Sequence, residues 1–222
     1  MTRLRRLLRL DPTRESGLTL IELIVAVGLL AIFLTMILGT VVGLARGATR
    51  AELVARATAG VLVVFGQLDR QARYADSINY PGTGSNNIMY IEFRTPGTSS
   101  ITGITTCTQW RFIPSSGHIE SRTWNDLPNA IKSPWSTELT GVLAMGGAKY
   151  PFEMLPAGLT SGSAAQQLLI RINAGSLSPD AGAAITTTFV ARNSSIQSPS
   201  NADVDGNKVS DTPVCMTAGT RP

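Results

Sequence analysis

The chain has 222 residues, which is room for one globular domain and an extension. Within residues 1–17, five arginines stand against two acidic residues, and they account for +3 of the formal net charge of +4. The rest of the chain is therefore close to neutral, which argues against a basic domain that binds nucleic acid directly.

The first long pattern is an apolar segment at residues 18–45, LTLIELIVAVGLLAIFLTMILGTVVGLA. A secretory signal has an apolar region of only about 7–15 residues, whereas about 20 apolar residues span a bilayer. A buried core helix is the third alternative. The arginines that precede the segment favour a single pass through the cytoplasmic membrane, with residues 1–17 in the cytoplasm and residues beyond about 46 outside.

One charged residue, Glu22, lies inside this apolar segment, where a charge is costly and usually marks a function. The string ESGLTLIELIVAV after a short basic leader resembles the prepilin signal of type IV pilins and type II secretion pseudopilins. In that family a membrane peptidase cuts after the glycine and methylates the new N-terminus. The resemblance implies cleavage between Gly17 and Leu18, with Glu22 as fifth mature residue. Leu18 departs from the family, in which phenylalanine or methionine is commoner.

The role implied for Glu22 is charge neutralisation in filament assembly. Its carboxylate would offset the N-terminal ammonium of a neighbouring subunit and so remove two isolated charges from hydrocarbon. The alternative is that Glu22 lies at the membrane interface and reaches the lipid headgroups.

Small residues recur along the same segment, with Gly39, Gly43 and Gly47 spaced by four. This spacing allows close helix–helix packing in apolar surroundings, so Gly39 and Gly43 are candidate packing residues. The alternative is a set of tolerated small residues without a packing role.

The helical period continues beyond the membrane segment in one apolar stripe, which consists of Leu53, Ala57, Val61, Val64, Leu68, Ala72 and Ala75. We therefore predict one helix over residues 18–76, about 85–90 Å long at 1.5 Å per residue. Residues 18–45 form the transmembrane and filament-core part of this helix. The remainder, to residue 76, is amphipathic. The segment LDRQARYAD resembles the helix end of W-type minor pilins and J-type minor pseudopilins.

Residues 77–222 are expected to form an extracytoplasmic β-rich domain. Residues 77–88 carry turn chemistry throughout. Alternating runs then predict strands at Met89–Phe93, Thr106–Ile113, His118–Trp124, Gln167–Asn173 and Ile185–Arg192, with a hairpin between the second and third. ITTTFVARNS resembles the last strand region of W-type minor pilins. The expected fold is α+β, a long N-terminal helix packed on an antiparallel sheet.

The two cysteines, Cys107 and Cys215, both follow the apolar segment. In a domain outside the cytoplasm such a pair favours a disulfide over a metal pair, because no CxxC spacing occurs. Two separate buried thiols are the alternative.

Residues 201–211, NADVDGNKVSD, place oxygen-bearing side chains at alternate positions around a glycine. This pattern resembles EF-hand and dockerin loops and makes Asn201, Asp203, Asp205, Asn207 and Asp211 candidate calcium ligands. A solvated Asx turn is the alternative, and no other cofactor is expected. The sole histidine, His118, lies in a predicted strand with no nucleophile motif near it, so we do not expect an enzyme.

The sequence therefore predicts a structural subunit of a type IV pilus-like filament, minor rather than major because the body is long and loop-rich. Its expected partners are prepilin peptidase, other pilin or pseudopilin subunits and an inner-membrane assembly platform. The alternatives are a minor pseudopilin of a type II secretion system, a membrane-anchored binding module that never polymerises, and a membrane-tethered enzyme.

Overall fold

The computed structural model describes residues 17, 19–145, 150–158, 162–175, 182–207 and 209–216. The chain divides into two compact units, Met1–Thr49 and Arg50–Pro222. One helix, α1 (Leu20–Arg73), contributes its first part to one unit and its last part to the other. The predicted helix over 18–76 is therefore present, and its described limits are slightly shorter.

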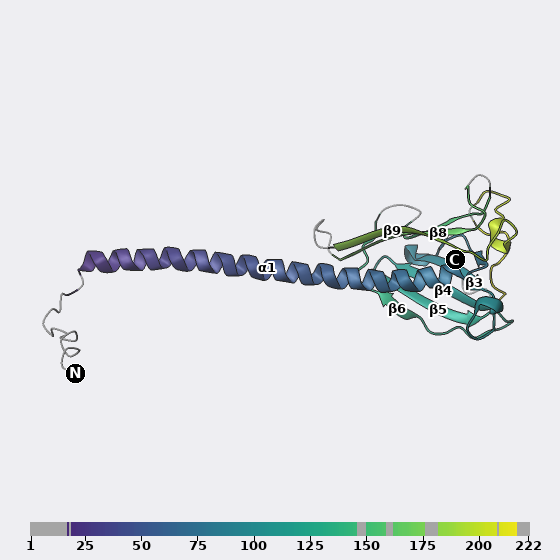
Figure 1. The fold of residues 1–222 in the computed structure, drawn as a ribbon, viewed down its shortest axis with the longest axis horizontal. Coiled ribbons are helices and arrows are strands. Elements are labelled where there is room, and N and C mark those ends of the chain that lie inside the picture. The colour runs from purple at the N-terminus through teal and green to yellow at the C-terminus, as the bar shows by residue number, and fades with distance from the viewer. Residues whose placement is uncertain are drawn as a thin grey trace, which may run out of the picture. The chain divides into compact units, whose positions relative to one another are not determined.

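The second unit contains nine strands among the described residues (Figure 1). They are β1 (Ser77–Ile78), β2 (Gly82–Thr83), β3 (Met89–Thr95), β4 (Thr106–Ile113), β5 (His118–Asn125), β6 (Ser136–Leu139), β7 (Phe152–Leu155), β8 (Gln167–Gly175) and β9 (Gly182–Val190). All strand pairs are antiparallel. The α+β class, with a long N-terminal helix packed on antiparallel strands, is confirmed.

The strands are divided between two sheets, where the sequence had led us to expect one. A six-stranded sheet has the order β1-β3-β4-β5-β6, with β2 also paired to β3, and a three-stranded sheet has the order β7-β8-β9. The predicted β4–β5 hairpin is confirmed, with Ile113 opposite His118. Gly117 makes its turn with a φ of +66°, a conformation that favours glycine.

Some strand limits differ from the predictions. Residues 77–88, which we expected to be turns throughout, contain β1 and β2 because their short backbone runs pair with β3. The strands β6 and β7 were not predicted, since four residues give too little alternation to recognise. The last strand begins earlier than predicted, at Gly182, and ends before Arg192, whose N–H donates to the Arg73 carbonyl instead.

The core of the second unit forms where the apolar stripe of α1 meets both sheets. Val61, Val64, Leu68 and Ala72 are buried on the helix, as the stripe predicted, whereas Leu53 remains half exposed. They pack with buried side chains of β3, β4, β5, β7, β8 and β9 in a single cluster. Gly60 permits a close approach of helix and β6, because a Cβ there would lie 2.8 Å from Leu139 Cδ1.

The end of α1 is set by local bonds. Asp69 and Arg73 form an ion pair across the last turn, at 2.6 Å. Asp76 then donates its backbone N–H to the Arg94 carbonyl at 2.9 Å, while its carboxylate accepts two bonds from the Arg94 guanidinium. The chain thus passes directly from the helix to the edge of the six-stranded sheet.

Candidate functional site

The first turn of α1 contains the residues on which the predicted function depends. Glu22 N–H donates to the Thr19 carbonyl at 3.0 Å and lies 3.4 Å from Thr19 Oγ1. Thr19 is therefore the N-cap and Glu22 the third helical residue, the Thr-x-x-Glu spacing of a capping box. We had not recognised this cap from the sequence, although the spacing TLIE displays it.

The cleavage position is only partly visible in the structure. Gly17 is exposed, and apart from its two chain neighbours no residue has an atom within 4 Å of the place a Cβ would occupy. Leu18, the other residue of the predicted cleavage site, lies outside the described residues.

The helix after Glu22 is apolar and exposed on all sides. Every side chain of residues 20–49 is exposed, and Phe33, for example, is 68% exposed. The most apolar stretch of this helix is long enough to cross a membrane, and none of it is buried. Length and composition therefore suit a membrane span, and an apolar surface of this extent requires lipid or protein around it.

Polar side chains within this apolar helix are satisfied by the helix itself. Thr35 donates to the Ile32 carbonyl at 2.8 Å, and Thr40 donates to Met36 at 2.6 Å. In contrast, the Glu22 carboxylate makes no hydrogen bond or ion pair with any residue that the structure describes. It is the one ionisable side chain between Leu20 and Ala45, so no other side chain of that stretch can form an ion pair with it.

The predicted packing glycines face open space in this chain. Apart from the adjacent residues and backbone of the helix itself, a Cβ added at Gly39 or Gly43 would have no neighbour within 4 Å. Contacts with the residues that the structure describes therefore do not require glycine at either position, and a packing role would involve another helix.

The decisive comparison concerns this same segment. A family model for the prokaryotic N-terminal methylation motif matches residues 12–38. The chain carries a type IV pilin-like signal. The signal spans the predicted cleavage position, the Thr19 cap, Glu22 and the first half of the apolar helix. No curated protein and no solved structure gave a significant match to the chain.

Beyond the signal, the two cysteines form a disulfide that attaches the C-terminal segment to β4. Cys107 and Cys215 are both buried, with Cα atoms 6.3 Å apart and a sequence separation of 108 residues. Trp124 and Val214 pack around the bond in a small second cluster. The pairing is the one that we expected from the sequence.

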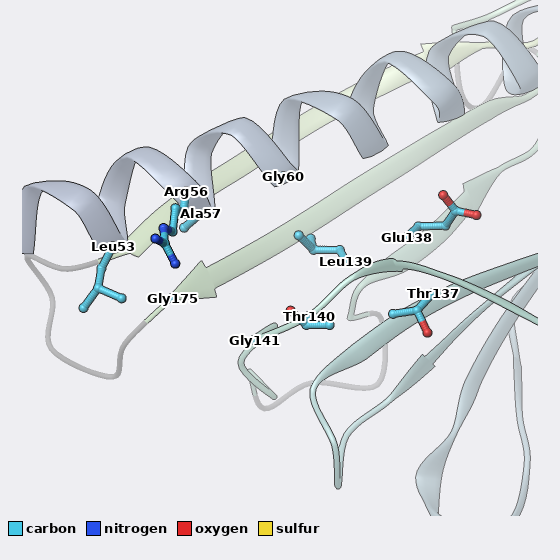
Figure 2. A pocket seen from close by; sticks show the side chains of 10 residues that line it. All are labelled: Leu53, Arg56, Ala57, Gly60, Thr137, Glu138, Leu139, Thr140, Gly141 and Gly175. Carbon is cyan, nitrogen blue, oxygen red and sulfur yellow. The ribbon is translucent and has the colours of Figure 1, made fainter.

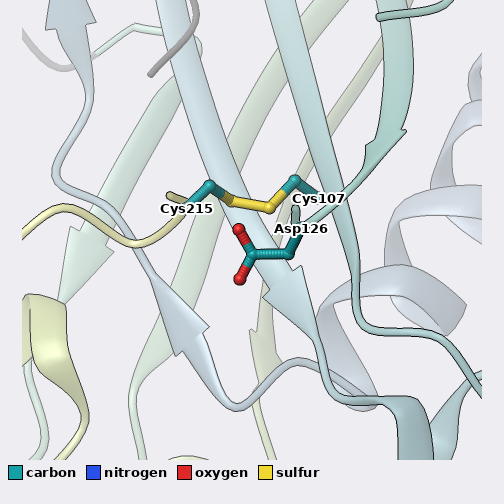
Figure 3. A group of neighbouring side chains, drawn as sticks. All are labelled: Cys107, Asp126 and Cys215. Carbon is teal, nitrogen blue, oxygen red and sulfur yellow. A yellow bond between two sulfur atoms is a disulfide. The ribbon is translucent and has the colours of Figure 1, made fainter. Parts of the chain in front are cut away.

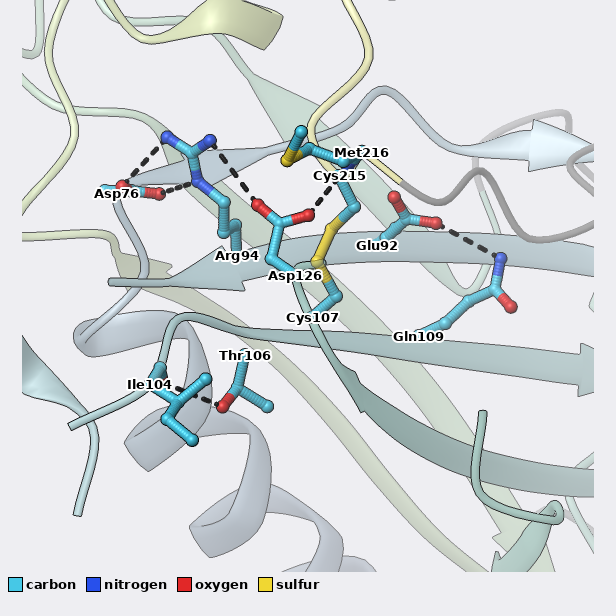
Figure 4. Close-up of a disulfide and its surroundings, with 10 residues drawn as sticks. All are labelled: Asp76, Glu92, Arg94, Ile104, Thr106, Cys107, Gln109, Asp126, Cys215 and Met216. Carbon is cyan, nitrogen blue, oxygen red and sulfur yellow. Dashed lines mark hydrogen bonds and ion pairs between the residues drawn. A yellow bond between two sulfur atoms is a disulfide. The ribbon is translucent and has the colours of Figure 1, made fainter. Parts of the chain in front are cut away.

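Asp126 lies against the disulfide, as Figure 3 shows. Its carboxylate accepts a bond from the Met216 N–H at 2.7 Å and lies 3.9 Å from the Arg94 guanidinium (Figure 4). Because both sulfurs are used in the disulfide, this group offers no thiolate for a metal ion. This network could not be predicted from the sequence, since Asp76, Arg94 and Asp126 are distant along the chain.

A cavity of about 510 Å³ opens beside the helix in the second unit (Figure 2). Leu53, Ala57 and Gly60 line it from α1, and Leu139 lines it from β6. Both charged residues of the lining have partners within the chain. Arg56 forms an ion pair with Glu52, and the Glu138 carboxylate accepts a hydrogen bond from the Ser121 hydroxyl. His118 lies elsewhere, at the start of β5, with its ring nitrogen 4.0 Å from the Glu120 carboxylate.

Several of the candidate calcium ligands use side-chain oxygen atoms in hydrogen bonds. Asp205 accepts from the Asn207 N–H at 3.1 Å, and Asp211 accepts from the Val204 N–H at 2.7 Å. Asn201 bonds both backbone groups of Ala157, at 2.7 Å and 2.9 Å. The Asp205 contact is that of an Asx turn, whereas the contacts of Asp211 and Asn201 join residues farther apart in the chain. Calcium binding by Asn201, Asp203, Asp205, Asn207 and Asp211 stays a prediction.

Proposed function

We propose that the chain is a structural, minor subunit of a type IV pilus-like filament. Prepilin peptidase cuts it between Gly17 and Leu18, and the apolar helix then packs it among other subunits. The observation that carries the proposal is the position of Glu22. It stands in the first turn of an exposed apolar helix, within the residues 12–38 that match the methylation motif.

The chemistry of assembly follows from this position. Cleavage leaves Leu18 with a free amine next to the apolar helix, and the Glu22 carboxylate has no partner among the described residues. Pairing the ammonium of one subunit with the Glu22 carboxylate of the next neutralises both charges in poorly solvated surroundings. Assembly then buries apolar helix surface that the isolated subunit leaves exposed.

Before assembly, the subunit resides in the cytoplasmic membrane as a single-pass protein. The arginines of residues 1–17 stay in the cytoplasm, and the second unit lies outside. The Cys107–Cys215 disulfide fits an oxidising compartment. Assembly requires an inner-membrane platform and other pilin subunits as partners, and the role is structural and not enzymatic.

The experiment is to determine the mature N-terminus by mass spectrometry on protein from its native cells. The proposal expects a chain that begins at N-methylated Leu18 and that is present in sheared filaments. An intact Met1 would contradict it and would favour the membrane-anchored binding module instead.

A minor pseudopilin of a type II secretion system is the second candidate, because pseudopilins use the same kind of signal. Both candidates expect methylated Leu18. Identification of the co-purifying subunits distinguishes them, since pilus subunits in sheared surface filaments favour the first and secretion components in the envelope favour the second.

A further inference from the structure

Strand β9 forms an outer edge of the three-stranded sheet. It pairs with β8 alone, over the full run from Gly182 to Val190 and without a register shift. Its other side makes no pairing with any strand that the structure describes.

The hydrogen-bond pattern shows which backbone groups point outward from β9. Ala191 N–H donates to the Gln166 carbonyl at 2.9 Å, in the same register as the β8–β9 pairs. Bonded and non-bonded pairs alternate along an antiparallel ladder, so Phe189 and Thr187 also bond toward β8. The residues between them have their backbone N–H and C=O groups on the opposite side, at the free edge of the sheet. These residues are Ala184, Thr186, Thr188 and Val190.

Two further observations agree with this assignment. On the opposite side of β8, Arg171 N–H donates to the Pro151 carbonyl, so the odd-numbered residues of β8 face away from β9. The residues of β9 with outward groups are all exposed, and none of them has a hydrogen bond to a described residue outside the ladder.

The other sheet edges carry the protections that monomeric proteins use. The β1 and β2 strands have two residues each, and β6 has four and includes Glu138. In β7, Phe152, Glu153 and Met154 are all buried. By comparison β9 has nine residues, GAAITTTFV, with no charge, no proline and no bulge.

The helix side of β9 is apolar as well. The Phe189 ring lies 5.0 Å from the ring of Phe65 on α1. Leu62, one turn before Phe65 on that side of the helix, is 57% exposed. A segment that lies along β9 would meet a row of unpaired backbone groups and an apolar strip next to it.

We propose that β9 is an assembly edge, where an extended, uncharged segment of a neighbouring subunit adds as a further strand. The inference rests on the proposed filament function. Another backbone in the extended conformation matches the spacing of such a row of donors and acceptors along its whole length and can replace the water there. A second copy of β9 does not suit this role, because two identical strands paired about a two-fold axis form a closed dimer, which does not continue along a filament.

The test uses full-length chains in cells that make the filament. Thr186→Pro removes an outward N–H and Thr186→Lys places a charge on the edge, while both leave the bonds to β8 in place. Thr123→Lys, on the exposed side of the inner strand β5, is the matched control. We expect both Thr186 variants to have the melting temperature and the processing of the wild type. Their amount in sheared filaments should be lower by about tenfold or more, and tenfold is equivalent to about 1.4 kcal/mol.

Thr187→Pro tests the assignment of the β8–β9 ladder. The backbone N–H of Thr187 donates to β8, so its loss should lower the melting temperature. A melting temperature lowered by Thr186→Pro and unchanged by Thr187→Pro would overturn the assignment of the outward groups. Wild-type incorporation of both Thr186 variants would overturn the proposal.

A photo-crosslinking amino acid at position 188 identifies what lies on the edge. We expect a cross-linked peptide from an uncharged extended segment of another filament subunit. A cross-link to β9 of a second copy, or the lack of any protein adduct in intact filaments, would overturn the inference. Failure of the proposed filament function can be told apart from failure of this inference. In the former case the wild-type chain itself would lack the cut after Gly17 or would be absent from filaments.

Discussion

The backbone N–H of Met216 donates to the carboxylate of Asp126 at 2.7 Å, one residue beyond the Cys107–Cys215 disulfide. Asp126 follows β5, and the same carboxylate faces the Arg94 guanidinium on β3. The C-terminal segment is thus held to the six-stranded sheet by a covalent bond and by a charged hydrogen bond next to it.

Replacement of Asp126 should loosen this attachment. The carboxylate is only 6% exposed, and a hydrogen bond to a charged group contributes about 1.5–3 kcal/mol. We expect Asp126→Ala to lower the free energy of unfolding by about that amount in urea titrations. Glu52→Ala is the control, because the Glu52–Arg56 pair is 60% and 76% exposed and its loss should change little. Equal effects of the two substitutions would contradict the assigned role of Asp126.

Removal of the disulfide should have the larger effect. Closing a loop across 108 residues contributes on the order of 4–5 kcal/mol in the chain-entropy model, and often less in practice. We expect the Cys107→Ser/Cys215→Ser double variant to unfold at lower urea concentration and to lose residues near 216 to protease first. Two free thiols in the denatured, unreduced wild-type protein would rule the bond out.

At the signal, the size of residue 17 should control processing. A peptidase that grips the chain at this position requires close backbone approach, which only small residues allow. We expect Gly17→Ala to retain much of the processing and Gly17→Val to leave the precursor uncut. Gel mobility before and after maturation measures the loss of the leader. Normal maturation of Gly17→Val would remove the cleavage hypothesis.

Charge and helix capping at Glu22 can be separated by two substitutions. Glutamine also serves at the third position of a capping box, so Glu22→Gln keeps the cap and removes only the charge. Breaking a buried ion pair costs about 3–5 kcal/mol. We therefore expect a processed, membrane-resident subunit that is missing from sheared filaments, with assembly reduced by more than about a hundredfold.

Thr19→Val is the matched variant, because it removes the cap and keeps the charge. The loss of an N-cap costs about 1 kcal/mol, so we expect a smaller decrease in assembly than for Glu22→Gln. Incorporation of Glu22→Gln at the wild-type level would exclude the charge-pair mechanism.

Tyr150 should make the second unit sensitive to alkali. Burial raises the pKa of its hydroxyl, and the hydrogen bond from the Asn173 N–H opposes that shift in part. The raised pKa means that the folded state keeps the proton while the unfolded chain loses it near pH 10.0. Its contribution to stability is thus complete below that pH and is lost as the pH rises through the folded pKa.

We expect the urea midpoint to decrease above about pH 10 in the wild type and to decrease less steeply in Tyr150→Phe. The phenylalanine variant should start from lower stability at neutral pH, because it loses the bond to the Leu143 carbonyl at 2.6 Å. Parallel pH profiles for the two proteins would show that Tyr150 does not titrate in this range.

The sequence determined those features that depend on neighbours along the chain. The apolar segment, Glu22 in the motif and the stripe with Val61, Val64 and Leu68 are periodic or local patterns, and each is found where the pattern indicated. The strands β4 and β5 were equally clear, because eight residues of alternation and a glycine turn specify a hairpin locally.

Only the tertiary structure decided how the strands are shared between two sheets and which edges stay open. The β6 and β7 strands are defined by their pairing partners, since their short runs carry little pattern of their own. The contact of Asp126 with Met216 and the outward-facing groups of Thr186 and Thr188 likewise depend on pairing between residues far apart in the chain. Strand pairing is a non-local interaction, whereas helix and turn signals act within a few residues, and this difference sets what the sequence alone can determine.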